Sequence, residues 1–300
     1  MKKRVLFILA LLMCISFAGG VKSSNSAAAT KSITISKKNF PDKKFRSYIR
    51  RKFDKNKNGK LSEKEIKKIR TLEVVNVYSE TKIDYQGIEY FTYLERLYLR
   101  NIEKIDLSKN RNLTSLTIAN ANLTKINLTK NKKLDYLEVE NCKKIRKMDL
   151  SKNSKLRILH CSRNKNLKEI SFPEKSELYD VYLPNNALQK LDVKNAKKLE
   201  YIECTNNQIK TLYVNQTPKL KDLYCGNNVL TKLDISNCPN LTDLQCFNNQ
   251  LKELSLINNT KLLGVDCGRN LITKIDISMC LQLNDQFFSH DPIVQVIRGA

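Results

Sequence analysis

Oxygen-bearing side chains recur along the segment DKNKNGKLSEKE, which runs from residue 54 to residue 65. Its positions 1, 3, 5, 9 and 12 carry carboxylate, amide or hydroxyl oxygens, position 6 is glycine, and position 7 offers a backbone carbonyl. In this pattern the glycine permits a sharp turn, and the final carboxylate binds a calcium ion through both oxygens. The predicted ligands of one calcium site are Asp54, Asn56, Asn58, Lys60, Ser62 and Glu65.

Helical spacing beside this segment completes an EF-hand pattern. The sequence DKKFRSYIRRKF precedes the loop with apolar residues at helical intervals, and Leu61 supplies the apolar eighth position. Only Asp54 and Glu65 among the ligands are charged, and lysines surround them. We therefore expect weak affinity, in about the 10⁻⁴ to 10⁻³ M class of extracellular modules, and a structural role for calcium. The alternative is a helical cap that keeps only the shape of the loop.

Leucine, cysteine and asparagine recur at fixed intervals through most of the remaining chain. Segments such as LEYIECTNNQIKTLYVNQTPK and LKDLYCGNNVLTKLDISNCPN share the pattern LxxLxCxxNxxLxxLxL, with one-residue slips. These are leucine-rich repeats of 21 to 22 residues, which bury their apolar sides by stacking into one core. The predicted fold is an α/β repeat solenoid, a horseshoe or arc with a parallel inner β-sheet and a helical EF-hand-like N-terminal cap. We expect the recurring asparagine to satisfy backbone groups where the chain turns.

Four cysteines, 21 residues apart, occupy positions that the pattern reserves for buried leucine: Cys204, Cys225, Cys246 and Cys267. We expect them to be free thiols in the core. Side chains of parallel strands in register point the same way, which disfavours disulfides between them. For Cys142, Cys238 and Cys280, which lie outside this series, a bridge stays open.

The first 30 residues have the composition of a secretory signal peptide. Lys2, Lys3 and Arg4 precede an apolar run from Val5 to Ala18, and cleavage is expected near residue 20 or 29. No later apolar run is long enough to span a membrane, so an extracellular, secreted or cell-surface protein is predicted. The net charge is +24, but export removes nucleic acid from the expected partners. The predicted divisions are a signal peptide (1–30), a helical cap (31–86), the repeats (87–283) and a C-terminal cap (284–300).

The EF-hand-like cap, the segment GIEYFTYLERLYL at residues 87–99 and the short repeats together resemble bacterial secreted or surface leucine-rich-repeat proteins of the internalin type. The resemblance spans about residues 40–283. It implies a solenoid that recognises a host or surface protein through its inner, concave sheet.

Aromatic and acidic residues flank the buried positions of the repeats. Because side chains alternate along a strand, these residues are expected on the exposed face of the inner sheet. Exposed aromatic residues on a rigid sheet are typical binding hot spots. The alternative is that they only stabilise neighbouring strands by packing across them. The predicted partner-binding residues are Tyr136, Glu138, Tyr182, Tyr201, Glu203, Tyr224 and Phe247.

Lysines recur on the expected turns and outer segments, giving the solenoid two sides of different charge. This second side is either a solvated surface or a charge-driven adhesin for anionic polymers, such as teichoic acid, mucin or sulfated glycans. The lysines are Lys155, Lys190, Lys198, Lys210, Lys219, Lys232, Lys252, Lys261 and Lys274.

Catalytic side chains are scarce in this sequence. The chain has two histidines, His160 and His290, and no nucleophile motif, phosphate-binding loop or HExxH string. The strand register directs His160 outward and the adjacent Cys161 inward, so they cannot act as a pair. We therefore predict that the protein is not an enzyme.

Overall fold

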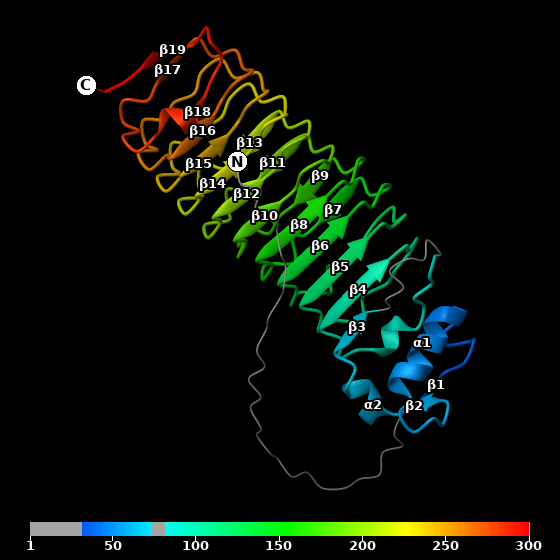
Figure 1. Cartoon of the computed structure of the whole chain (residues 1–300). Coiled ribbons are helices and arrows are strands. Elements are labelled where there is room, and N and C mark those ends of the chain that lie inside the picture. Colours follow the sequence, from blue (N-terminus) through cyan, green and yellow to red (C-terminus); the bar gives the residue numbers. More distant parts are fainter. Residues whose placement is uncertain (1–31, 74–81, 300) are drawn as a thin grey trace, which may run out of the picture. The chain divides into compact units, whose positions relative to one another are not determined.

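An eleven-stranded parallel sheet is the main feature of the computed structural model, which describes residues 32–73 and 82–299 (Figure 1). The predicted signal peptide lies outside the described residues. This sheet is the inner sheet expected from the repeats, and its strands follow chain order. They are β3 (Thr71–Glu73), β4 (Arg96–Arg100), β5 (Ser115–Ala119), β6 (Tyr136–Glu140), β8 (Ile158–Ser162), β10 (Asp180–Tyr182), β12 (Tyr201–Glu203), β14 (Asp222–Tyr224), β15 (Asp243–Gln245), β16 (Gly264–Asp266) and β18 (Phe288–Ser289).

The register of the inner sheet aligns equivalent residues of successive repeats. Leu116 pairs with Leu137, which in turn pairs with Leu159, and all three are fully buried. In each inner-sheet strand from β5 to β16, the second residue is buried and the first and third residues are half exposed. No coil can bury its apolar side alone, so stacking creates the core. The predicted repeat solenoid is confirmed.

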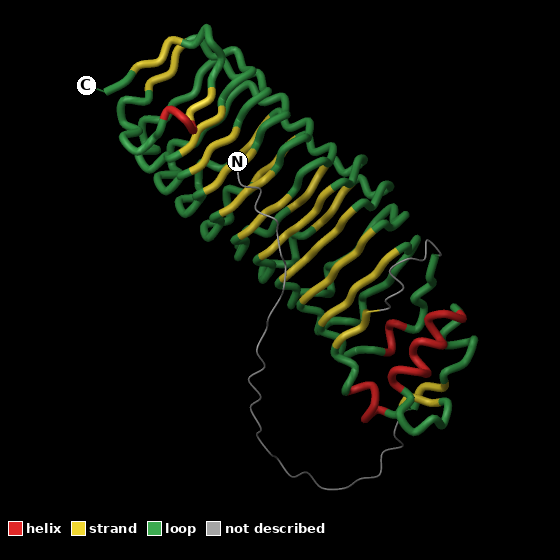
Figure 2. Tube along the Cα trace, in the orientation of Figure 1, coloured by secondary structure: helices red, strands yellow, loops and turns green. Residues whose placement is uncertain are grey.

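The outer side of the coils is built from short strands and turns. The strands are β7 (Lys147–Asp149), β9 (Glu169–Ser171), β11 (Lys190–Asp192), β13 (Thr211–Tyr213), β17 (Lys274–Asp276) and β19 (Gln295–Ile297). They form three separate parallel pairs, β7 with β9, β11 with β13, and β17 with β19. Within the described ranges, α-helices occur only before the repeats, because a 21-residue coil leaves this side only a short extended segment. The red segment near the C-terminal end in Figure 2 is a short 3-10 helix at Asp285–Phe287.

Two helices flank the predicted calcium loop at the N-terminal end of the solenoid. Helix α1 (Lys43–Phe53) begins after Asp42, whose carboxylate accepts a hydrogen bond from the Phe45 amide at 2.8 Å. Helix α2 (Glu63–Lys67) begins near the end of the loop. The loop contains β2 (Lys60–Leu61), which pairs antiparallel with β1 (Ile33–Thr34) from before α1. The inner sheet begins at β3, earlier than residue 87, because Leu72 already pairs with Leu97.

Buried aromatic residues join these helices to the first coil. The Phe40 ring stacks on that of Phe91 at a centroid distance of 6.0 Å, and Phe45 lies 5.1 Å from Tyr85. The short 3-10 helix η1 (Ile88–Tyr90) belongs to the same cluster. All four aromatic side chains are almost completely buried, so they cover the apolar end of the repeat core.

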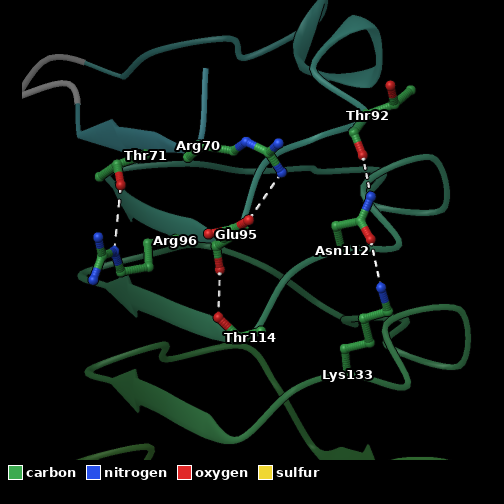
Figure 3. Close-up of polar contacts among 8 residues, drawn as sticks. All are labelled: Arg70, Thr71, Thr92, Glu95, Arg96, Asn112, Thr114 and Lys133. Carbon is green, nitrogen blue, oxygen red and sulfur yellow. Dashed lines mark hydrogen bonds and ion pairs between the residues drawn. The ribbon is translucent and has the colours of Figure 1, made fainter. Parts of the chain in front are cut away.

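Side-chain hydrogen bonds connect the first coils to one another (Figure 3). The Asn112 amide donates to the Thr92 carbonyl at 2.9 Å and accepts from Lys133 Nζ at 2.7 Å. On the sheet side, Arg70 forms an ion pair of 2.9 Å with Glu95. These contacts follow the stacking direction, so each coil holds the next in register.

A ladder of buried and half-buried asparagines connects coils further along the chain. Asn228 is representative: its Oδ1 accepts from the Ile209 amide at 2.9 Å, and its Nδ2 donates to the Cys204 and Cys225 carbonyls at 3.0 Å each. The structural reading of the recurring asparagine is thereby confirmed. The ladder consists of Asn164, Asn186, Asn207, Asn228, Asn249 and Asn270.

The C-terminal segment adds one more incomplete coil. Its strand β18 extends the inner sheet beside β16, after the 3-10 helix η2 (Asp285–Phe287), and β19 pairs with β17. The Asp291 carboxylate accepts from the amides of Arg269 and Asn270 at 2.8 and 3.0 Å. It thus ends the asparagine ladder by satisfying the last backbone donors.

Every described cysteine is a buried free thiol, including the three for which a bridge was left open. Burial raises the pKa of Cys204 to about 12 and that of Cys142 to about 11. These thiols are therefore protonated near neutral pH and act as small core residues. Cys142 stands at the asparagine-ladder position of its coil, where its amide donates to Asn164 Oδ1 at 2.8 Å.

Candidate functional site

The half-exposed face of the inner sheet holds most of the predicted partner-binding residues. We call it the outward face and define it by the first and third residues of the inner-sheet strands β6, β8, β10, β12, β14, β15 and β16. Tyr136 and Glu138 lie on β6, Tyr182 on β10 and Tyr201 on β12, each at a half-exposed position. Glu203 and Tyr224 occupy equivalent positions on β12 and β14. Strand alternation therefore brings six of the seven predicted residues onto one face.

Tyrosine hydroxyls donate to carboxylates along this face. The Tyr136 hydroxyl lies 2.9 Å from Glu138 Oε2, and the Tyr201 hydroxyl lies 2.9 Å from Glu203 Oε2. Tyr224 donates to Asp243 Oδ2, also at 2.9 Å. The pKa of Tyr201 is raised mainly by burial and to a smaller extent by the negative charge of Glu203, so this hydroxyl stays protonated. These bonds hold the rings in fixed positions.

Ring packing across strands also orders the outward face. The Tyr201 and Tyr224 rings meet edge to face, with centroids 5.7 Å apart. His160 packs in the same manner between Tyr136, at 5.7 Å, and Tyr182, at 5.6 Å. The rings thus make the cross-strand contacts of the structural alternative while remaining half exposed. Both roles are compatible in this geometry.

Phe247 differs from the other predicted residues because it follows strand β15 instead of lying in it. A side chain at Gly226 would meet the Phe247 ring, since a Cβ there would lie 2.6 Å from the ring. The missing side chain of Gly226 therefore makes room for this half-exposed ring beside the end of the sheet.

Three features of the inner sheet were not identified from the sequence. Tyr98 on β4 is half exposed in the same row as Glu138, and the register of the LERLYL segment could have located it. The hydroxyl-to-carboxylate bonds have no sequence signal. Asp180 Oδ1 is buried without a hydrogen-bond donor among the described residues, and His160 Nε2 lies 3.5 Å from it.

Acidic charge on the outward face contrasts with the net charge of the chain. The first and third residues of β6, β8, β10, β12, β14, β15 and β16 include six Asp or Glu and no Lys or Arg. Another acidic residue of these strands, Glu140, pairs with Arg163 at 2.9 Å. In residues 32–73 and 82–299, no ion pair shorter than 4.0 Å joins a lysine or arginine to Glu138, Glu203, Asp243 or Asp266. The half-buried Asp243 has a raised pKa because burial disfavours its charge.

Lysines lie elsewhere, as the sequence predicts. All nine lysines that the sequence assigns to this side are exposed, on turns or on outer strands such as β11 and β17. Some form exposed ion pairs, for example Lys198 with Glu177, and the Lys190 ammonium lies 4.9 Å from the centre of the Tyr213 ring. Such exposed pairs contribute little to stability, so the outer side remains accessible to charged ligands.

The predicted calcium loop folds around its own oxygen atoms. Asp54 is 4% exposed, and its carboxylate accepts from the Asn58 and Gly59 amides at 3.1 and 2.9 Å. Gly59 has a φ of +73°, which favours glycine at this turn. The Asn56 and Asn58 side chains accept from amides two residues further on, at 3.1 and 2.9 Å. The loop therefore orders these side-chain oxygens within one turn.

Glu65 closes this loop from the first turn of α2. Its Oε1 accepts from the Lys55 amide at 3.1 Å, and its Oε2 accepts from the Ser62 amide and hydroxyl at 2.9 and 2.7 Å. Burial alone would raise the pKa of Glu65, but these hydrogen bonds lower it. The described residues contain no group of three or more His, Cys, Asp or Glu able to hold a metal ion. A cation in this loop would therefore depend on amide, hydroxyl and carbonyl oxygens in addition to the carboxylates of Asp54 and Glu65.

Two further geometric features bear on function. His160 is half exposed while Cys161 is fully buried, so the structure separates this histidine from its neighbouring thiol as expected. Among the described helices, none has the length and apolar character needed to cross a bilayer.

Comparison with solved structures identifies internalins as similar folds. The functional domain of InlJ from Listeria monocytogenes, which includes a cysteine ladder, is 26% identical with a TM-score of 0.62; the match covers 89% of this chain and 63% of that one. The chain is an internalin-like leucine-rich-repeat solenoid. Because the match covers 63% of the InlJ domain, this chain spans less than two thirds of that domain. Neither a protein-family model nor a curated protein sequence matches it.

Two more distant structures share the fold alone. The internalin InlF from L. monocytogenes is 22% identical with a TM-score of 0.53, and the match covers 88% of this chain and 94% of that one. A chain of the Toll–Spatzle complex from Drosophila is 18% identical with a TM-score of 0.54, and the match covers 71% and 32%.

Proposed function

We propose that this chain is an exported, secreted or cell-surface protein-binding module that recognises a host or surface protein through the outward face of its inner sheet. The observation that carries the proposal is the row of half-exposed tyrosines fixed by carboxylates and by edge-to-face packing. Rigid aromatic side chains lose little conformational entropy on binding and are enriched among hot spots. The internalin-like fold and the occurrence of this fold in the Toll–Spatzle complex support the same function.

Paired tyrosine variants test this proposal. The chain without residues 1–30 is immobilised, and proteins from host-cell extracts and bacterial surface extracts are captured, identified and titrated. Y201A/Y224A should weaken binding of the captured protein at least tenfold, because two central rings are removed. Y213A is the matched control, since Tyr213 is exposed on the outer strand β13. Equal binding by Y201A/Y224A, Y213A and the parent protein would contradict recognition by the outward face.

The exposed lysines support a second candidate function, adhesion to anionic polymers such as teichoic acid, mucin or sulfated glycans. The variant K210Q/K232Q/K252Q removes three exposed charges from the outer side. Under this alternative, the variant should bind the polymers several-fold more weakly than the parent protein does. Raising the salt concentration should also weaken polymer binding by the parent protein. Salt-resistant binding to a protein would instead support the outward face.

We also propose that the loop from Asp54 to Glu65 holds one structural calcium ion. Its support is the oxygen donor set, ordered by the positive φ of Gly59 and by loop amides. The donors fit a hard cation that prefers oxygen ligands. When bound, the ion would connect α1 to α2, and the remainder of the cap would depend on the aromatic cluster around Phe40.

Thermal and chemical unfolding with calcium or with a chelator test this site. With a dissociation constant of about 10⁻⁴ to 10⁻³ M, 10 mM calcium should stabilise the protein by about 1.4 to 2.7 kcal/mol. E65Q should abolish most of this increase, whereas E63Q should retain it because Glu63 is exposed and pairs with Lys67. The same calcium response in E65Q and the parent protein would exclude this loop as the site.

A further inference from the structure

The outward face has the wrong charge for a chain of this composition. The protein carries a net charge of +24, yet the outward face holds six acidic residues and no lysine or arginine. Elsewhere in the described chain, acidic side chains commonly pair with bases, as Glu169 does with Lys147 at 2.6 Å. Negative charge is therefore concentrated on one surface and compensated on the other.

The carboxylates of this face are held by neutral groups. Glu203 accepts from the Tyr201 and Thr205 hydroxyls at 2.9 and 3.1 Å. Asp243 is half-buried and accepts from Tyr224. A hydroxyl fixes the position of a carboxylate without neutralising its charge, and partial burial makes that charge costly. A cation supplied by a partner would remove this cost.

Aromatic rings lie beside the same carboxylates. Tyr201 and Tyr224 meet edge to face, so each presents part of a ring close to Glu203 or Asp243. A ring face and a carboxylate together suit an ammonium or guanidinium group, which interacts with both. Asp180 on the neighbouring strand adds a further half-exposed carboxylate, whose Oδ1 lies 3.5 Å from His160 Nε2.

We infer that the partner segment recognised by the outward face is rich in lysine and arginine. This inference rests on the proposed function and specifies its chemistry: cationic side chains would insert between the tyrosines and pair with Glu203, Asp243 and Asp266. The remaining surface favours this specificity, because its net positive charge repels cationic segments that approach elsewhere. A basic protein segment is thus directed to the inner sheet.

The inference is tested by comparing peptide binding between two triple variants of the protein that have the same net charge. The probe is a fluorescent 20-residue peptide of alternating Lys and Ser, with a Glu and Ser peptide for comparison, followed by anisotropy at 50 and 150 mM NaCl. E203Q/D243N/D266N keeps the side-chain shapes and should weaken binding of the Lys peptide at least tenfold. The control E169Q/E177Q/E253Q removes the same charge from exposed positions off the inner sheet and should change binding less than twofold. Unfolding midpoints of both variants verify that they fold.

The outcomes separate this inference from the function on which it rests. Equal weakening by both triple variants would overturn it, because binding would then follow net charge alone. Failure of the parent protein to bind the Lys peptide would also overturn it. The parent protein could fail to bind the Lys peptide while Y201A/Y224A still weakens binding of the protein captured from extracts. Protein recognition by the outward face would then stand, and only the inferred cationic chemistry of the partner would be wrong.

Discussion

The same acidic residue types behave differently on the two sides of the solenoid. On the outer turns, Asp234 Oδ1 accepts from the Ser236 amide and hydroxyl at 3.1 and 2.7 Å, and these bonds lower its pKa. On the inner sheet, burial raises the pKa of Asp243, and its hydrogen bond from Tyr224 only partly offsets that effect. The first carboxylate stabilises a local turn, whereas burial makes the charge of the second unfavourable for the fold.

This contrast separates structural from recognition surfaces. Turn aspartates recur beside serine in coil after coil, with Asp106, Asp149 and Asp276 accepting from the amide two residues on. Their role is therefore set by the repeat. On the outward face, Asp243 instead accepts from Tyr224 of the neighbouring strand. Charged groups kept in costly positions are often functional.

The largest expected effect comes from the buried side of a strand whose other side forms the outward face. L223A removes a fully buried side chain of β14 and should lower the free energy of unfolding by about 2 to 5 kcal/mol, because a cavity forms in the core. Y224A on the same strand should cost much less, since its ring is half exposed. Urea denaturation of both variants checks this, and equal losses would show that the outward ring is mainly structural.

A smaller effect is expected at the asparagine ladder. N228A leaves the Ile209 amide and the carbonyls of Cys204 and Cys225 without their side-chain partner, which should cost about 1 to 3 kcal/mol. The exposed Asn195 provides the control, because N195A changes an outer turn residue. Denaturation midpoints that fall equally for N228A and N195A would contradict a structural role specific to the ladder.

The smallest effect is a difference of sign between two aspartates. The pKa of Asp234 is lowered in the folded state, so the stability of the parent protein relative to D234N should fall as the pH drops below about 4. The pKa of Asp243 is raised, so the parent protein should gain stability relative to D243N as the pH falls from neutral through that pKa. Urea denaturation of both variants from pH 7 to pH 3.5 measures the two trends. Parallel trends would refute the contrast between the two sides.

The repeat pattern predicted much of the candidate site because strand geometry depends only on local alternation. Once Leu137 and Leu159 are assigned to the core, Glu138 and His160 must point the other way. Phe247 shows the limit of this reasoning, since the strand ends before it and its ring occupies space that a side chain at position 226 would fill. The calcium ligands follow from spacing alone, and their occupancy stays a prediction.

The amino-acid sequence by itself determined the coil length, the buried positions and the exposed alternate rows, because these depend on periodicity within one repeat. Only the tertiary structure decided which side chains meet between coils. The bond from Tyr224 to Asp243 and the packing of Tyr201 on Tyr224 join residues about 20 positions apart, through strands that are neighbours only after stacking. Stacking is likewise what gathers single acidic residues from separate repeats onto one face, because each coil contributes at most one of them.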